Sequence, residues 1–405
     1  MADLSSLDVL LHGEKIAALT LLPGDNTLLT FEEKYVQDQN RPTLSLSLKD
    51  AYGELITNQR PVRTRVPPFF SNLLPEGPLR AYLAKRAGVK QEREFHLLWA
   101  LGQDLPGAVR IQPGDGAAWP EDKSAPKGLN ANDAKAKALR FSLAGVQLKF
   151  SAVTKATGGM TIPASGQGGS WIVKLPSAHF PGVPENENAM MELARMAGMD
   201  VPETMLLPIS EIEGLPDGME QLGGNVFVIK RFDRSEDGSL IHIEDFAQIF
   251  GVYPDKKYSQ ASYRNLADVI ASEVGDTGIQ EYIRRIVFNA LIGNADMHLK
   301  NWSLIYPDKR HAALAPAYDF VATTPYLPDD DMALRLGRSK RFDEFDAAQI
   351  SYFAAKARLP EKFVVDTARE TVQAFDDLWA KAKKELGMSK ALIAALEKHR
   401  KIVPL

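Results

Sequence analysis

Cysteine is absent from this 405-residue sequence. Its absence excludes disulfide bonds, thiolate nucleophiles and cysteine-ligated metals, and it suits a protein of the reducing cytosol. No apolar run approaches membrane-spanning length, and Asp3 and Asp8 stand where a secretory signal would carry basic residues. We therefore expect a cytoplasmic protein with no membrane segment.

An excess of basic charge is also missing. The 48 basic and 52 acidic side chains leave a formal net charge of −4, and the sequence pI is near 6.0. This balance gives no overall basic field for direct binding of nucleic acid. What is present is an ordinary globular composition, with 45% hydrophobic and 25% charged residues. The length allows two or three domains with sizeable cores.

The most informative segment is residues 288–320, in which an apolar, helix-like run gives way to closely spaced polar residues. Asp296 and Asn301 stand five positions apart, the spacing at which protein kinases place the base and the metal-binding asparagine of the catalytic loop. The strand-like residues 302–306 and a turn would return Asp319 beside Asn301 as a second magnesium ligand. The alternative is a polar turn whose Asp and Asn side chains cap helices.

Lys174 stands inside a strongly apolar, strand-like sequence. Lysines are rarely buried unless an anion pairs with them, and a kinase uses such a lysine on the nucleotide phosphates, oriented by a glutamate of the next helix. The helical pattern at 185–197 offers Glu185, Glu187 and Glu192 for that role. An equally open alternative is a strand-edge lysine that reaches solvent along its flexible stem.

Other segments fit a two-lobed organisation around these residues. Residues 140–150 predict part of a hairpin whose loop could lie over phosphates, with Lys149 adding charge; a solvated hairpin is the alternative. The apolar strand at 226–232 ends where a kinase hinge would present backbone groups to an adenine. Helical patterns follow at 243–250, 263–273, 279–292 and through 345–401. Strands first and helices after indicate an α+β fold, with the site between a sheet lobe and a helical lobe.

The first hundred or so residues predict a separate, compact α+β unit. Strands and helices are expected at 9–22, 44–48, 78–88, 92–102 and 108–112. This unit shows no cluster of acid, base and nucleophile, so we interpret it as a structural or partner-binding module. Residues 113–137 then shift to Gly, Pro, Ala, Asn and Lys, the composition of a linker.

Ordered motifs run through nearly the whole chain. The kinase-like part carries SLAGVQLK at 142–149, IVKLP at 172–176, KRFDR at 230–234, EDFAQ at 244–248, NADMHLKN at 294–301 and AYDF at 317–320. The first part carries LSLSL at 44–48, FSNLLP at 70–75 and GQDLPGAV at 102–109. Together they resemble the HipA family of bacterial toxin serine/threonine kinases. The resemblance implies an N-terminal domain over 1–112, a linker over 113–138, and a protein-kinase-like fold with a small lobe over 139–232 and a helical lobe over 233–405.

The resemblance also implies roles for individual residues. Asp296 would be the catalytic base, and Asn301 and Asp319 would bind Mg²⁺. ATP would be held by a phosphate-side loop, a lysine with its glutamate partner, the hinge and two polar loops, namely Ala144, Gly145, Val146, Gln147, Leu148, Lys149, Lys174, Glu187, Lys230, Arg231, Phe232, His298, Leu299, Lys300, Asn301, Tyr318, Asp319, Phe320 and Val321. Ser142 would be autophosphorylated, and about two added negative charges beside the phosphate-side loop would switch the kinase off.

Partners follow from the resemblance in the same way. Members of that family pair with a small, HipB-like helix-turn-helix antitoxin that binds operator DNA. Bound to that complex, they act as co-repressors. Their substrates lie in the translation machinery, with aminoacyl-tRNA synthetases the known kind, so that phosphorylation produces growth arrest or persistence. A basic C-terminal segment could touch DNA phosphates or be the solvated face of a helix; it comprises Lys381, Lys383, Lys384, Lys398, Arg400 and Lys401.

Two other functions stay open at this point. The chain could be a catalytically weak, nucleotide-bound module that acts mainly as antitoxin partner and co-repressor. Intact Asp296, Asn301, Asp319 and Lys174 argue against that, because a pseudokinase usually loses one of them. The chain could also be a small-molecule kinase, which would have a closed pocket facing the base where a protein kinase leaves an open groove.

Overall fold

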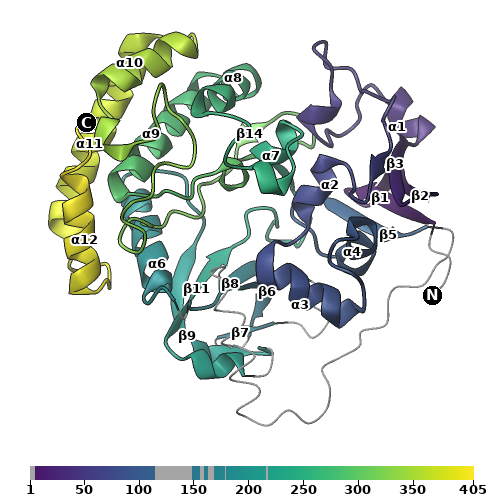
Figure 1. Cartoon of the computed structure of the whole chain (residues 1–405), viewed down its shortest axis with the longest axis horizontal. Helices are drawn as coiled ribbons and strands as arrows, with labels where there is room; N and C mark the ends of the chain where they lie inside the picture. Colours follow the sequence, from purple (N-terminus) through teal and green to yellow (C-terminus); the bar gives the residue numbers. More distant parts are fainter. Residues whose placement is uncertain (1–4, 115–147, 156–158, 163–167, 178, 216–217) are drawn as a thin grey trace.

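The computed structural model describes residues 5–114, 148–155, 159–162, 168–177, 179–215 and 218–405 (Figure 1). Three sheets organise this part of the chain. They define an N-terminal domain (5–113), a small lobe (148–232) and a C-lobe (233–405). The predicted α+β arrangement, with a sheet-rich small lobe followed by a helical lobe, is confirmed. The predicted linker falls almost wholly outside the described residues.

The N-terminal domain is built on a five-stranded antiparallel sheet in the order β4-β3-β2-β1-β5. Every second residue of β1 is buried, including Leu7, Val9 and Leu11, so one face of the sheet carries the domain core. The strands are β1 (Ser6–Leu11), β2 (Glu14–Leu22), β3 (Asn26–Phe31), β4 (Val62–Arg63) and β5 (Val109–Pro113). The helices are α1 (Glu33–Gln37), α2 (Pro68–Leu73), α3 (Gly77–Ala87) and α4 (Glu94–Leu101).

The expected strand at 44–48 is wrong. A short 3-10 helix, η1 (Leu46–Leu48), forms there instead, and the side chain of Ser45 caps it by accepting a hydrogen bond from the backbone N–H of Ser47. Serine side chains favour such local bonds over a strand ladder. Leu44 and Leu48 are buried on either side of this Ser45 cap. The alternation of Leu and Ser therefore does not mark a strand here.

The small lobe is a six-stranded sheet in the order β10-β7-β6-β8-β11-β9. The strand β11, which lies between β8 and β9, is buried on both faces. Phe227 and Ile229 pack toward the core shared with the helix α6, and Val226 and Val228 pack toward the lobe's own core. The elements are β6 (Lys149–Thr154), β7 (Met160–Thr161), β8 (Trp171–Lys174), α6 (Val183–Met196), β9 (Thr204–Pro208), η2 (Ile209–Glu211), β10 (Ile212–Glu213), η3 (Met219–Leu222) and β11 (Asn225–Lys230).

The C-lobe packs its helices around α9, twelve of whose seventeen residues are buried. The helices are α7 (Phe246–Ile249), η4 (Pro254–Lys256), α8 (Tyr263–Glu273), α9 (Asp276–Ile292), η5 (Leu299–Asn301), η6 (Phe342–Glu344), α10 (Ala347–Lys356), α11 (Glu361–Ala382) and α12 (Lys390–Arg400). A small antiparallel sheet joins β12 (His242–Asp245), β13 (Ser303–Tyr306) and β14 (Ala313–Leu314). In Figure 1, α11 and α12 lie on the side of the molecule opposite the N-terminal domain.

The helix expected over 243–250 is wrong in its first half. Residues up to Asp245 form β12, which pairs with β13 about sixty residues further along the chain. The helix α7 begins only at Phe246, where Asp245 and Gln248 form a reciprocal capping box. A distant strand partner thus overrides the local helical pattern.

Buried charges join the N-terminal domain to the hinge region. Asp233 accepts hydrogen bonds from Arg231 at 2.8 Å, from Arg234 at 2.9 Å and from the backbone N–H of Gly107 at 2.8 Å. Both arginines also reach Asp104 of the N-terminal domain, at 3.1 and 3.0 Å. Gly107 has φ +75°, and a Cβ there would lie 2.9 Å from the backbone N of Ile243, so only glycine permits this approach.

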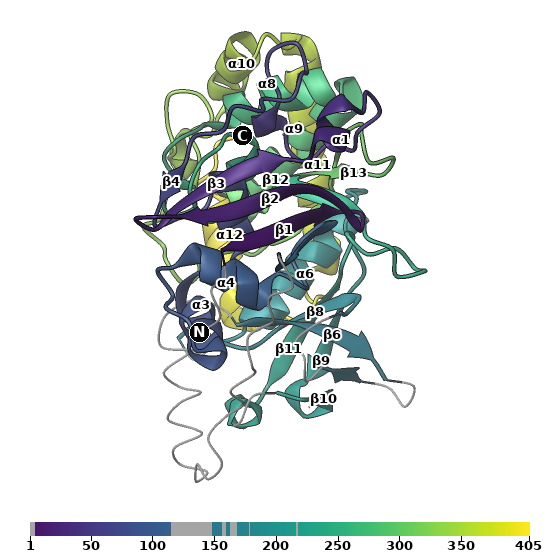
Figure 2. The ribbon, with the colours of Figure 1, turned by 90° about the vertical axis from the view of Figure 1, so that its right-hand side faces the viewer.

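Segment 294–320 itself supplies β13 and β14 of the C-lobe sheet. Figure 2 shows β1, β2 and β3 side by side in front of the C-lobe, with the small-lobe strands below them. Within the described residues, no helix combines the length and the apolar character that crossing a membrane requires.

Candidate active site

The catalytic-loop segment 294–301 is held by backbone geometry at its start. Helix α9 ends at Gly293, which has φ +69°, and a Cβ there would lie 2.2 Å from Thr324 Oγ1. Asn294 then donates from Nδ2 to Asn289 Oδ1 at 2.8 Å and to the backbone O of Asp319 at 3.0 Å. The loop and the segment that carries the second predicted metal ligand are thus tied together directly.

Asp296 presents its carboxylate to solvent, with 52% of the side chain exposed. Its Oδ1 accepts a hydrogen bond from the hydroxyl of Tyr258, and Oδ1 lies 4.0 Å from His298 Nε2. Partial burial raises the pKa of Asp296 above its usual range, while the bond from Tyr258 opposes that change. Burial also lowers the pKa of His298 to about 3, so this imidazole is neutral near pH 7 and is a weaker proton acceptor than an ordinary histidine.

Lys174 at the end of β8 forms ion pairs with Glu187 of α6 and with Asp319. The lysine is only 8% exposed, so the solvent-reaching alternative is excluded. Burial alone would lower the pKa of Lys174, but Asp319 and Glu187 outweigh it and raise the pKa. Burial alone would likewise raise the pKa of Asp319, but Lys174 and Lys149 lower it to about 2. A lysine and a carboxylate are thus kept charged at the centre of the site.

Lys149 faces the same space as Lys174. The two residues are paired directly across strands β6 and β8, which places their side chains on one face of the sheet. Like charges in that relation repel each other, so the arrangement favours an anion between them. The phosphate-side loop itself is not described: Ser142, Ala144, Gly145, Val146 and Gln147 lie outside the described residues, and Leu148 is buried.

The donor set suits magnesium bound through a nucleotide. Asn301 donates from Nδ2 to the backbone O of Asp296 at 2.8 Å, which leaves Oδ1 as the atom for a cation. Tyr318 donates to the backbone O of Lys300 at 3.0 Å and so brings the Asp319 segment to this loop. In the part of the chain that the structure describes, no three His, Asp or Glu residues gather to hold a metal. One carboxylate, one amide and substrate phosphates are what Mg²⁺ commonly uses.

Several predicted nucleotide residues contribute no free side chain. Leu299 and Phe320 are fully buried in the C-lobe core, and Arg231 is engaged in the network around Asp233. At the hinge, Lys230 Nζ lies 3.9 Å from Glu203, and the ring of Phe232 lies 5.6 Å from that of Tyr318. Through these residues a nucleotide would meet mainly backbone atoms and the Phe232 ring. Val321 is half-buried next to Phe320.

The sequence interpretation did not single out Tyr258, Lys257 or Glu76, which lie around Asp296 and Lys300. Tyr258 contacts Asp296, and Lys257 and Lys300 both pair with Glu76 of the N-terminal domain, at 2.8 and 2.7 Å. The N-terminal domain, interpreted from the sequence as a structural or partner-binding module, therefore also contacts residues beside Asp296. Glu76 follows the FSNLLP motif directly, but no local pattern connects it with a loop more than two hundred positions away.

Comparison with known proteins agrees with this geometry. The model of the HipA N-terminal domain matches residues 7–112, and that of the HipA-like C-terminal domain matches residues 141–379. A protein of Sinorhizobium fredii named putative kinase Y4dM is 54% identical and covers 100% of this chain and 98% of its own length. The serine/threonine-protein kinase toxin HipA of Shewanella oneidensis is 27% identical over 85% of this chain and 82% of that protein.

A solved structure shows the same fold. It contains Shewanella oneidensis HipA with HipB and its operator DNA, and it matches with a TM-score of 0.75 at 20% identity, over 98% of this chain and 95% of that chain. Two models of one family thus match the chain in sequence order. The N-terminal model covers the N-terminal domain, and the C-terminal model covers most of the two lobes. The chain belongs to the HipA family.

Proposed function

We propose that this protein is an ATP- and Mg²⁺-dependent serine/threonine protein kinase. The observation that carries the proposal is the pairing of Lys174 with both Glu187 and Asp319, next to a solvent-exposed Asp296. A kinase needs this lysine and glutamate together with a metal-binding aspartate and a free base. A module that only binds a nucleotide does not require an exposed carboxylate at the position of Asp296.

The residues divide the chemistry between them. Asp296 would accept the proton of a serine or threonine hydroxyl while the hydroxyl oxygen forms a bond to the γ-phosphorus and the bond to the ADP oxygen breaks. Lys174 and Lys149 would bind phosphate oxygens. Asn301 and Asp319 would hold Mg²⁺, which neutralises charge on the phosphates when bound.

Regulation and partners form the finer part of the proposal. The protein would be the toxin of a type II toxin–antitoxin system, would autophosphorylate on Ser142, and would phosphorylate a translation protein such as an aminoacyl-tRNA synthetase. A HipB-like helix-turn-helix antitoxin would neutralise it and carry it to operator DNA as co-repressor. Family membership supports this, as does the presence of HipB and operator DNA beside the structurally similar HipA.

Direct DNA contact through the basic C-terminal segment is not included in the proposal. Arg400 pairs with Asp376 at 2.8 Å, and Lys383 pairs with Glu397 at 2.5 Å. These intramolecular partners favour the interpretation of a solvated helix face.

The test is incubation of the full chain with Mg-ATP, followed by intact-mass and peptide mass spectrometry. We expect one phosphate on Ser142 in the wild type and none in Asp296→Asn, which keeps the shape of the base but cannot accept the proton. Asp308→Asn, in the exposed turn before the Asp319 segment, is the matched control and should behave as wild type. Bound ATP without any phosphate gain in the wild type would refute kinase activity.

A further inference from the structure

Glu76 belongs to the N-terminal domain, yet its carboxylate contacts two lysines of the C-lobe. Oε1 lies 2.7 Å from Lys300 Nζ, and Oε2 lies 2.8 Å from Lys257 Nζ. Lys300 also donates to the backbone O of Asn72, at the end of α2, at 3.1 Å. The side chains of Lys300 and Lys257 are only 15% and 19% exposed. Partial shielding from water makes such a bridge stronger and more specific in geometry than an exposed ion pair.

The segment 252–258, which carries Lys257, is fixed by the same part of the N-terminal domain. Three contacts join the two: Asn72 Nδ2 donates to Val252 O at 2.8 Å, Tyr253 OH donates to Val66 O at 3.2 Å, and Arg65 pairs with Asp255 at 2.9 Å. The segment is therefore held in place from outside the C-lobe along most of its length.

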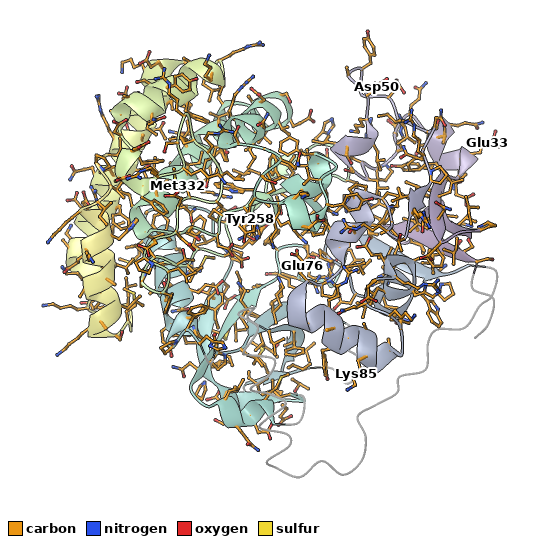
Figure 3. The ribbon with its side chains drawn as sticks, in the orientation of Figure 1. Glu33, Asp50, Glu76, Lys85, Tyr258 and Met332 are labelled. Carbon is orange, nitrogen blue, oxygen red and sulfur yellow. The ribbon has the colours of Figure 1, made fainter. Side chains whose placement is uncertain are left out.

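The same segment ends on the catalytic loop. The backbone O of Lys257 accepts a hydrogen bond from the N–H of Leu299 at 3.3 Å. The next residue, Tyr258, donates its hydroxyl to Asp296, and its ring packs edge-on against His298 with centroids 4.9 Å apart. Figure 3 shows Glu76 and Tyr258 near the centre of the molecule, between the N-terminal domain and the C-lobe. Contacts thus run without interruption from the N-terminal domain to the carboxylate of Asp296.

We propose that Glu76 is a positioning residue of the active site, which acts through Lys257, Lys300 and Tyr258 to hold Asp296 in place for phosphoryl transfer. The proposal rests on the kinase function proposed above. It makes the N-terminal domain a part of the catalytic unit. Without the carboxylate of Glu76, two neighbouring ammonium groups lose their shared anion, repel each other and can turn toward Asp296 or Asp319. A displacement of the base by about 1 Å is enough to cost on the order of a hundredfold in rate.

The first experiment compares full-length wild type with Glu76→Gln in transfer of labelled phosphate from Mg-ATP to the chain itself. We expect the rate constant of this transfer to fall about ten- to a hundredfold, with the half-saturating ATP concentration changed by less than about twofold. A general loss of folded structure would weaken ATP binding as well, so a slower transfer at unchanged half-saturating ATP distinguishes positioning from a purely structural role.

Two further variants make the result specific. Glu54→Gln removes a carboxylate of the same domain that, within the described residues, forms an ion pair with Arg41 at 3.4 Å, and it should leave the rate constant of transfer unchanged. Tyr258→Phe, which removes the hydrogen bond to Asp296, should slow the transfer as Glu76→Gln does. The double variant should be at most about twofold slower than the slower single variant, because both changes break one chain of contacts. Full activity of Glu76→Gln, or losses that multiply in the double variant, would overturn the proposal.

Hydrogen exchange gives a readout that does not depend on activity. The amide of Leu299, bonded to Lys257, should exchange at least about tenfold faster in Glu76→Gln and at an unchanged rate in Glu54→Gln. An unchanged rate in Glu76→Gln would refute the positioning role even if the wild type transferred no phosphate. A wild type that transfers no phosphate would refute the proposed function, whatever the exchange rates show.

Discussion

The small lobe and the N-terminal domain approach the catalytic loop from different sides and in different ways. The small lobe reaches the site through Lys174, whose partner Asp319 is also the proposed metal ligand. The N-terminal domain reaches it through Glu76, whose partners Lys257 and Lys300 lie beside the base. Phosphates and a cation would compete for the first contact during turnover, whereas the second can persist. In the proposed kinase, Lys174 and Asp319 would therefore exchange partners when the nucleotide binds, whereas Glu76 would keep its two lysines.

The buried contact of the small lobe is where we expect the largest effect. Lys174→Met leaves Glu187, with a side chain 2% exposed, and Asp319 without their cation. Removing one partner of a buried ion pair costs about 3–5 kcal/mol, and the variant should also lose ATP affinity. Urea unfolding and ATP titration measure the two effects. Lys155→Met, which removes an ion pair with the exposed Glu213 of the same lobe, should cost no more than about 1 kcal/mol. Equal losses of unfolding free energy in Lys174→Met and Lys155→Met would contradict the assignment of Lys174 to a buried, stabilising ion pair.

A smaller loss of unfolding free energy is expected at Asp233, which joins the N-terminal domain to residues 231–234. Asp233→Asn keeps the side-chain volume but removes the charge that both Arg231 and Arg234 contact. Hydrogen bonds to charged groups contribute about 1.5–3 kcal/mol, so the free energy of unfolding should fall by about 2–3 kcal/mol. Asp343→Asn is a close match, because that aspartate also pairs with an arginine two positions earlier but on the surface. A urea midpoint that shifts equally in both variants would show that burial is not the cause.

The dependence of folding stability on pH should report the ion pairs of Glu76 with Lys257 and Lys300. Burial alone would raise the pKa of Glu76, but Lys300 and Lys257 lower it from 4.5 to about 2. A carboxylate whose pKa is lowered on folding stabilises the folded state fully above its unfolded-state pKa, near 4.5, and loses that contribution as the pH falls toward 2. The difference in unfolding free energy between wild type and Glu76→Gln should therefore shrink over this range. A difference that stays constant in urea unfolding from neutral to acidic pH would argue against the ion pairs.

The smallest effect is expected at an exposed ion pair between the N-terminal domain and the C-lobe. Arg65 and Asp255 are paired at 2.9 Å with 41% and 50% of their side chains exposed. Arg65→Gln should change the free energy of unfolding by less than about 1 kcal/mol, and high salt should abolish the difference. A loss as large as that of Asp233→Asn would mean that exposed contacts, too, fix the domain.

Local sequence patterns indicated several of the candidate site residues. The spacing of Asp296 and Asn301 and the lysine in an apolar strand indicated residues that the structure brings to one place, and Glu187 was chosen from three glutamates on one predicted helix. Patterns failed where a distant partner decides, as at 243–250, where β13 pairs with the segment and makes its first half a strand. They also failed at 44–48, where a serine cap competes with a strand.

The sequence by itself determined the family, the α+β order of strands and helices, and the candidate residues for kinase chemistry, because motifs and periodicity are properties of neighbouring positions. Only the tertiary structure decided which side chains point into the site and which pack in the core, as Leu299 and Phe320 do. It alone joined Glu76 and Tyr258 to the catalytic loop. The reason is physical: an ion pair depends on the distance between charges in space, and no pattern in the chain records that distance for residues far apart in sequence.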